Sequence, residues 1–143
     1  MDQPDQDSDQ QQLEALSGKK LLWVEDDHQL NQIMEKWLSK YGLQLKHTTH
    51  GERALKMIAE DPPDIILIDI LLPDINGFQI LERLKADERL QDIPTIMFSN
   101  LSSDTDIAQG KELGADRFIV KSTIFLDSLA QEIVQVLEEK GRL

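Results

Sequence analysis

The run Ile65 to Ile68 constrains the fold more than any other part of the sequence, because its apolar residues are consecutive and rich in β-branched side chains. A short run of this kind is typical of a strand that is buried on both faces of a parallel sheet. The run ends at Asp69, and a dense turn signal, Pro-Asp-Ile-Asn-Gly, follows at 73–77. Open α/β sheets bind ligands at the carboxyl ends of their strands, so Asp69 is the first candidate for chemistry.

Strands and helices are predicted to alternate along the rest of the chain. Apolar runs indicate the strands, and apolar residues at helical spacing indicate the helices. This alternation favours right-handed βαβ units. The predicted fold class is α/β: a doubly wound, five-stranded parallel sheet of flavodoxin-like order 2-1-3-4-5 with five helices. We expect strands at 20–24, 43–47, 65–68, 94–98 and 117–120, and helices at 28–41, 51–60, 77–87, 104–113 and from 126 onward.

Two of the predicted helices differ in how much apolar surface they offer. Helix 104–113 has few apolar residues and contains Gly110, which costs about 1 kcal/mol relative to alanine in a helix interior. We therefore expect it to be the loosest helix. Helix 28–41, by contrast, has a predicted inward face of Leu30, Ile33, Met34, Trp37, Leu38 and Tyr41.

Composition and charge limit the class of protein. The 143 residues suffice for one domain with a real core, and the absence of cysteine excludes disulfides and thiolate metal sites. Residues 1–17 are rich in Asp, Gln and Ser, so we expect a disordered tail before a domain at 18–143. No signal peptide or membrane span is evident, which favours a cytoplasmic protein. The formal charge of -12 argues against direct binding to nucleic acid or to an anionic membrane.

Polar side chains end four of the five predicted strands, and in this topology they meet at one edge of the sheet. Carboxylates that converge there repel one another and raise a pKa unless a cation neutralises them. A few hard oxygen ligands, with room for water and phosphate oxygens, suit Mg²⁺. The strand-end residues are Glu25, Asp26, Asp69, Ser99 and Lys121.

With Mg²⁺ bound, Asp69 is a plausible nucleophile toward phosphorus, because carboxylates form aspartyl phosphates. Phosphoryl transfer requires neutralisation of the charge on the equatorial oxygens more than it requires acid–base chemistry. The Lys121 ammonium and the Ser99 hydroxyl are available for this task. These groups offer an acidic protein a local means of holding phosphate.

The segments VEDD, DILLPDINGF, MFSN and GADRFIVK, in this order and spacing, resemble the receiver domain of two-component response regulators from about residue 19 to 140. The resemblance implies that Asp69 is the phosphoacceptor. It implies Mg²⁺ binding by Asp26, Asp69 and the backbone carbonyl of Leu71, with Glu25 acting through water. It also implies that Ser99 and Phe118 form a switch pair.

The sequence departs from the usual receiver pattern at three places. Ser122 follows Lys121 where proline is usual, often in a cis peptide, and Asn100 replaces the usual small residue after the switch hydroxyl. Leu71 and Leu101 are apolar at positions that tune hydrolysis in the family. Neither side chain can orient an attacking water, so we predict slow autodephosphorylation.

The resemblance implies a signalling module that is no conventional enzyme but catalyses its own phosphorylation. A sensor histidine kinase or a histidine phosphotransfer protein is the expected donor, and an unidentified downstream protein is expected to bind the surface of helix 104–113, strand 117–120 and the last helix. A phosphorylation-dependent homodimer is also open. The alternatives are a phosphorelay shuttle, the excised receiver of a longer regulator, a degenerate receiver, and an aspartate-nucleophile phosphatase. Such phosphatases need a second aspartate at the position of Leu71.

Overall fold

The computed structural model describes residue 11 and residues 13–143. Strands and helices alternate as the sequence predicts, with most boundaries within two residues. Two 3₁₀ turns, η1 and η2, join them. The elements are β1 (Lys20–Val24), α2 (His28–Leu38), η1 (Ser39–Tyr41), β2 (Gln44–Thr48), α3 (Gly51–Glu60), β3 (Ile65–Ile68), α4 (Gly77–Lys85), β4 (Thr95–Ser99), α5 (Asp104–Glu112), β5 (Arg117–Val120), η2 (Lys121–Thr123) and α6 (Leu126–Glu139).

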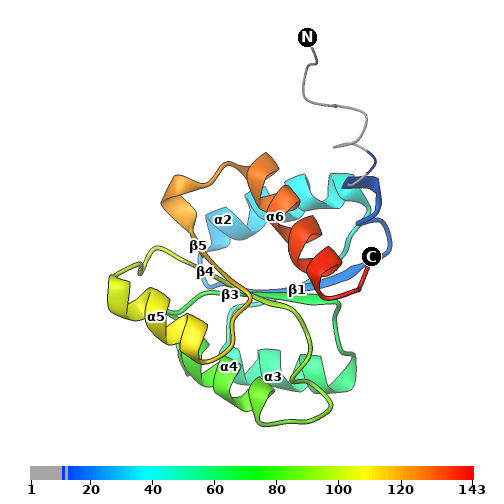
Figure 1. Ribbon diagram of the computed structural model, residues 1–143. Helices are drawn as coiled ribbons and strands as arrows, with labels where there is room; N and C mark the ends of the chain where they lie inside the picture. Colours follow the sequence, from blue (N-terminus) through cyan, green and yellow to red (C-terminus); the bar gives the residue numbers. More distant parts are fainter. Residues whose placement is uncertain (1–10, 12) are drawn as a thin grey trace.

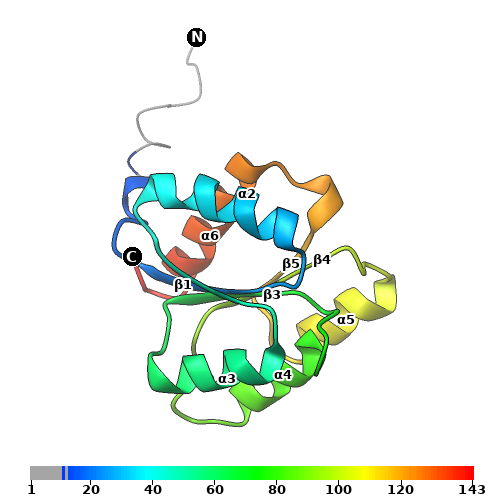
Figure 2. The same ribbon diagram turned by 180° about the vertical axis from the view of Figure 1, so that it is seen from behind.

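The five strands form one parallel sheet in the order β2-β1-β3-β4-β5, which confirms the predicted topology. Helices α2 and α6 cover one face, and α3, α4 and α5 cover the other (Figures 1 and 2). The strand β3, which contains the consecutive apolar run Ile65–Ile68, is central and fully buried. The carboxyl ends of β1, β3, β4 and β5 therefore lie along one edge of the sheet.

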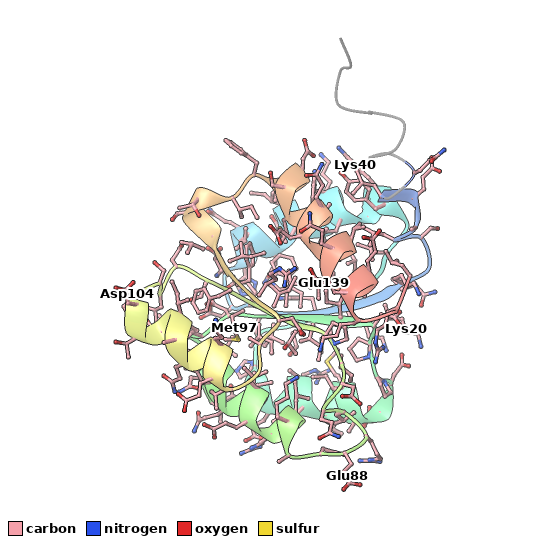
Figure 3. All side chains as sticks on the ribbon, in the orientation of Figure 1. Lys20, Lys40, Glu88, Met97, Asp104 and Glu139 are labelled. Atoms are coloured by element: carbon pink, nitrogen blue, oxygen red, sulfur yellow. The ribbon has the colours of Figure 1, made fainter. Side chains whose placement is uncertain are left out.

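The sheet separates two apolar cores, and successive residues of each strand enter opposite ones. Trp23 and Leu67 pack in the core shared with α2 and α6, whereas Val24 and Ile68 pack in the core shared with α3 and α4. Met97 of β4 points into the second core, where side chains fill the space between sheet and helices (Figure 3). A consecutive apolar run is what this two-sided burial requires.

The inward face of α2 differs from the prediction. Its buried residues are Asn31, Met34 and Leu38, while Ile33 is 54% exposed. Apolar spacing alone placed Ile33 inside, because a polar Asn31 was not considered as an inward residue. The helix also ends at Leu38, and the expected last turn is the 3₁₀ turn η1.

Ordered packing begins before the expected boundary at residue 17. Leu16 has no exposed surface and belongs to the core under α2 and α6, and Leu13 packs against the same core. The predicted tail at residues 1–10 and 12 lies outside the described residues and stays a prediction. No helix in the described part of the chain is both long and apolar enough to span a membrane.

Candidate functional site

Three carboxylates meet at the carboxyl edge of the sheet. Glu25 and Asp69 are 1% and 6% exposed, whereas Asp26 is exposed. One carboxylate oxygen of each residue lies within 4.8 Å of the others. Parallel pairing produces this proximity, because Val24 at the end of β1 lies opposite Ile68 at the end of β3. The residues that follow these two strand ends therefore share one site.

Lys121 reaches this acidic cluster from the end of β5. Its Nζ donates to Asp69 Oδ2 at 2.8 Å and forms an ion pair with Glu25. Burial alone would lower the pKa of the Lys121 ammonium, but the hydrogen bonds to Asp69 and Glu25 outweigh it and raise the pKa above 10.5. Lys121 is thus a permanent cation at the phosphoacceptor candidate.

The Glu25 carboxyl has the most perturbed acidity in the cluster. Burial raises its pKa from 4.5 to about 7, and the charge of Asp69 adds to this rise, although Lys121 opposes it. The single positive charge of Lys121 thus does not fully neutralise the negative charge of the carboxylates around it. This uncompensated negative charge and the oxygen-only donors of Glu25, Asp26 and Asp69 fit a hard divalent cation. Histidine and lysine contribute no ligand to this group among the described residues.

The loop after Asp69 is fixed tightly under the site. Asp69 Oδ1 accepts a hydrogen bond from its neighbour, the Ile70 amide, at 2.7 Å. Gly77 donates its amide to the Ile70 carbonyl at 2.9 Å, and a Cβ at Gly77 would lie 2.3 Å from the Asp69 carbonyl oxygen. Only glycine permits this approach of backbone to backbone. The turn that the sequence predicts at 73–77 therefore holds the backbone of Asp69 in place.

Ser99 lies at the same edge of the sheet, at the end of β4, and is 1% exposed. Its Oγ accepts a hydrogen bond from the Leu101 amide at 3.2 Å, and within the described part of the chain it makes no hydrogen bond to the carboxylates. The predicted switch partner, Phe118, is half-buried in β5. A Cβ at Gly110 of α5 would lie 3.2 Å from the Phe118 ring, which gives this mid-helix glycine a packing role. The switching role of Ser99 and Phe118 stays a prediction.

Leu71 and Leu101, the two predicted apolar neighbours of the acceptor, are 60% and 38% exposed. The role of the Leu71 carbonyl as a metal ligand stays a prediction. No peptide bond of the described residues is cis, so the bond between Lys121 and Ser122 is trans. Lys121, Ser122 and Thr123 form the turn η2.

Two residues that sequence reasoning missed hold the backbone of the site. The carbonyl of Glu25 accepts a hydrogen bond from Asn31 Nδ2 at 3.1 Å and contacts His47 Nε2 at 3.0 Å. Asn31 is on α2, and His47 is on the edge strand β2, where it is exposed. A polar residue on the inward face of a helix, at the spacing of Met34 and Leu38, was the signal that could have identified Asn31.

Comparison with known proteins bears on this geometry. A family model described as the response regulator receiver domain matches residues 21–134. The transcriptional regulatory protein AfsQ1 of Streptomyces coelicolor is 35% identical over 101 residues, which are 71% of this chain and 44% of that protein. The transcriptional regulatory protein GltR of Pseudomonas aeruginosa is 30% identical over 107 residues, which are 75% of this chain and 44% of that protein. The chain thus spans less than half the length of these curated relatives.

Solved structures share the fold. The BeF3-activated N-terminal receiver domain of RstA from Klebsiella pneumoniae is 28% identical, with a TM-score of 0.73 over 82% of this chain and 97% of that one. The family match and the shared fold are thus both consistent with a site made by the charged side chains at the carboxyl edge of the sheet.

Proposed function

The chain belongs to the response regulator receiver domain family, and we propose from this that it carries a phosphoryl signal on Asp69. The observation that carries the proposal is the contact of Lys121 Nζ with Asp69 Oδ2 at 2.8 Å inside a cluster of three carboxylates. A buried lysine that pairs with a strand-end aspartate supplies positive charge where a phosphoryl group would add negative charge. The long-range field of a protein with a charge of -12 would otherwise repel phosphate.

The proposed reaction transfers a phosphoryl group from a phosphohistidine to Asp69. A carboxylate oxygen of Asp69 attacks phosphorus, so that an O–P bond forms while the N–P bond of the donor breaks. The imidazole nitrogen leaves with the electron pair and takes up a proton. Lys121 neutralises charge on one phosphoryl oxygen, and the hydroxyl of Ser99 donates to another after it leaves the Leu101 amide.

Magnesium is the cation that we propose for the site. Glu25, Asp26 and Asp69 would hold it, together with the carbonyl of Leu71, and the ion would supply charge neutralisation for the phosphoryl group. The oxygen-only donor set and the incompletely neutralised negative charge at Glu25 support this assignment. The chain's own residues still provide the nucleophile and the second cation.

We propose that phosphorylation alters the surface made by α5, β5 and α6. Only Gly110 of α5 is buried, so this helix has few apolar contacts to hold one position. The Phe118 ring packs against Gly110, and Ile107 in α5 and Phe125 directly before α6 are exposed at 38% and 82%. A shift of Ser99 toward the phosphoryl group and of Phe118 inward would therefore change this surface.

The proposed donor is a sensor histidine kinase or a histidine phosphotransfer protein in the cytoplasm, and the recipient of the signal is a protein or a second copy of this chain. The curated relatives are named as transcriptional regulators, but this chain spans less than half of each. With its negative charge, the domain itself is not proposed to bind nucleic acid. No observation favours the phosphatase alternative, since Leu71 stands at the position of its second aspartate.

The test is phosphoryl uptake from a small donor. Wild type, Asp69→Asn and Asp64→Asn are incubated with acetyl phosphate and Mg²⁺, and intact masses are compared. Asp64 lies just before β3, at the opposite end of the same strand, and so controls for loss of a carboxylate. We expect the mass gain of one phosphoryl group in wild type and Asp64→Asn and none in Asp69→Asn. An equal gain in all three proteins would overturn the proposal.

A further inference from the structure

A hydrogen bond joins two loops that each follow a residue of the site. Oδ1 of Asn100 accepts from the backbone N–H of Ser122 at 2.9 Å. Asn100 comes directly after Ser99 at the end of β4, and Ser122 comes directly after Lys121 at the end of β5. These strands are neighbours, with Ser99 opposite Val120. The bond therefore links the segment that contains Ser99 and its hydroxyl to the segment that contains Lys121 and its ammonium.

The bond depends on the residue types at both positions. A proline at position 122 would have no N–H to donate. An alanine at position 100 would have no side-chain acceptor. Either substitution would therefore remove this bond.

The turn η2, which carries Lys121, has little other polar support. Val120 makes no side-chain cap for it, and the hydrogen bond from Thr123 Oγ1 to the Val120 carbonyl at 3.0 Å lies within the same segment. The bond from Ser122 to Asn100 reaches a different strand. The Lys121 side chain, only 12% exposed, extends from this turn to Asp69 and Glu25. The distance from the Lys121 ammonium to Asp69 and Glu25 therefore depends on the position of the turn η2.

The loop that follows β4 is held at its start by Ser99. Ser99 Oγ accepts from the Leu101 amide at 3.2 Å, so the hydroxyl is bonded to the residue directly after Asn100. A change in the position of Asn100 would move the hydroxyl and the lysine turn relative to each other.

We propose that Asn100 is a positioning residue that, through the Ser122 amide, sets the distance between the Ser99 hydroxyl and the Lys121 ammonium, so that both reach one phosphoryl group on Asp69. The inference rests on the proposed function of Asp69. A misplacement of either group weakens transition-state stabilisation, and we expect a loss of roughly three- to tenfold in phosphoryl uptake from an exposed bond of this kind.

The test uses Asn100→Ala, Ser122→Pro, the double variant and Ser122→Ala. Ser122→Ala is the matched control, because it keeps the N–H and loses only the hydroxyl. The first readout is acetylation of the Lys121 amine by acetic anhydride, without Mg²⁺ or a phosphoryl donor, measured by peptide mass. The second is the rate constant of phosphoryl uptake at saturating acetyl phosphate and Mg²⁺, with the apparent donor affinity fitted separately.

We expect Asn100→Ala and Ser122→Pro each to speed acetylation of Lys121 and to slow uptake, with donor affinity unchanged. The double variant should be no slower than the slower single variant, because both remove the same bond. Ser122→Ala should acetylate as wild type does. A purely structural bond would lower thermal stability and leave both readouts unchanged.

Unchanged acetylation and uptake in Asn100→Ala, or multiplied effects in the double variant, would overturn the inference. The proposed function of Asp69 and the positioning role of Asn100 can be refuted independently of each other. If wild type takes up no phosphoryl group, the proposed function fails, while the acetylation rates still decide whether Asn100 positions Lys121.

Discussion

At the scale of single residues, the site concentrates negative charge that folding alone does not compensate. Glu25 is buried beside Asp69, and only one cation, Lys121, reaches both among the described residues. Burial of an incompletely paired carboxylate is costly, which is why the Glu25 pKa is raised to about 7. The proposed phosphoryl site, with its divalent cation, would need such uncompensated negative charge, which lowers the stability of the protein in the absence of the ion.

The Glu25 pKa predicts how stability depends on pH. The folded protein holds this proton more tightly than the unfolded chain, so the stabilising contribution is fully present below pH 4.5 and is lost as the pH rises through about 7. Glu25→Gln lacks this loss. Its free energy of unfolding relative to wild type should therefore increase by on the order of 2 kcal/mol between pH 4.5 and pH 8.

Urea unfolding in the presence of a chelator, at a series of pH values, measures this difference. Glu35→Gln, which removes an exposed carboxylate from α2, is the control and should show little change. A Glu25→Gln difference that stays flat across this range would contradict the account of the site.

The apolar side chains beside Asp69 predict a long-lived signal. Leu71 is 60% exposed and Leu101 38%, and neither can orient an attacking water. We expect a phosphoryl half-life of many minutes at room temperature, and Leu71→Asn should shorten it several-fold. Decay of the phosphorylated mass after removal of the donor measures both. Leu71→Met keeps the apolar character and should decay as wild type does; a half-life of seconds in wild type would refute the prediction.

At the scale of elements, loops and helix ends are fixed by side chains from distant parts of the chain. The N-terminus of α3 has no side-chain cap of its own at His50. Asp74, in the loop after β3, accepts instead from the amides of Gly51 and Glu52 at 2.8 and 2.9 Å. In the same loop, Asn76 caps α4 through a capping box with Gln79. The loop after β3 is thus bonded to the N-terminus of α3.

Removal of the Asp74 carboxylate should destabilise the protein by about 1 kcal/mol at neutral pH, as loss of a helix cap does. Burial alone would raise the Asp74 pKa, but the amide hydrogen bonds outweigh it and hold the pKa at about 2. The contribution is present above pH 3.8 and disappears as the pH falls through about 2. Asp74→Ala should therefore converge with wild type in acid, as thermal unfolding would show.

Asp92→Ala is the matched control for this experiment. Asp92 is exposed, and its side chain makes no hydrogen bond or ion pair within the described chain. A loss of stability equal to that of Asp74→Ala, or one that persists in acid, would argue against a capping role.

Amide hydrogen exchange should identify α5 as the least protected of the helices α3 to α6. Helix α4 buries Phe78, Ile80, Leu81 and Leu84, whereas α5 buries only Gly110. We expect peptides from α5 to exchange about tenfold faster or more than those from α4, because fewer apolar contacts are lost when α5 opens. Equal protection of the two helices, measured by mass spectrometry, would remove α5 as the natural switching element.

At the scale of the whole molecule, parallel pairing brings together residues that are far apart in sequence. Glu25, Asp69 and Lys121 were predictable as one site because each follows an apolar strand and the carboxyl ends of parallel strands share an edge. Nearly every element followed from apolar patterns, and the strand order followed from the flavodoxin-like topology that the alternation of strands and helices favours. These features depend on periodicity, which any reader of the sequence can recognise.

Other features depend on contacts for which the sequence has no pattern. The contact of His47 with the Glu25 carbonyl, and the bond between Asn100 and Ser122, arise only when segments far apart in sequence meet. Apolar spacing also misjudged Ile33, since a buried Asn31 satisfied a backbone carbonyl that no apolar residue could satisfy. The burial of Leu16 was not predicted, because two leucines in a polar stretch are a weak signal.

We propose above all that the carboxylate of Asp69 carries the phosphoryl group. Borohydride reduces an acyl phosphate and leaves free carboxylates intact, so a phosphorylated aspartate becomes homoserine, which peptide mass spectrometry can locate. After incubation with acetyl phosphate and Mg²⁺, the account predicts homoserine at position 69 and intact aspartate at position 26. Homoserine at any other position, or a phosphoryl group that resists borohydride on a serine or histidine, would contradict it.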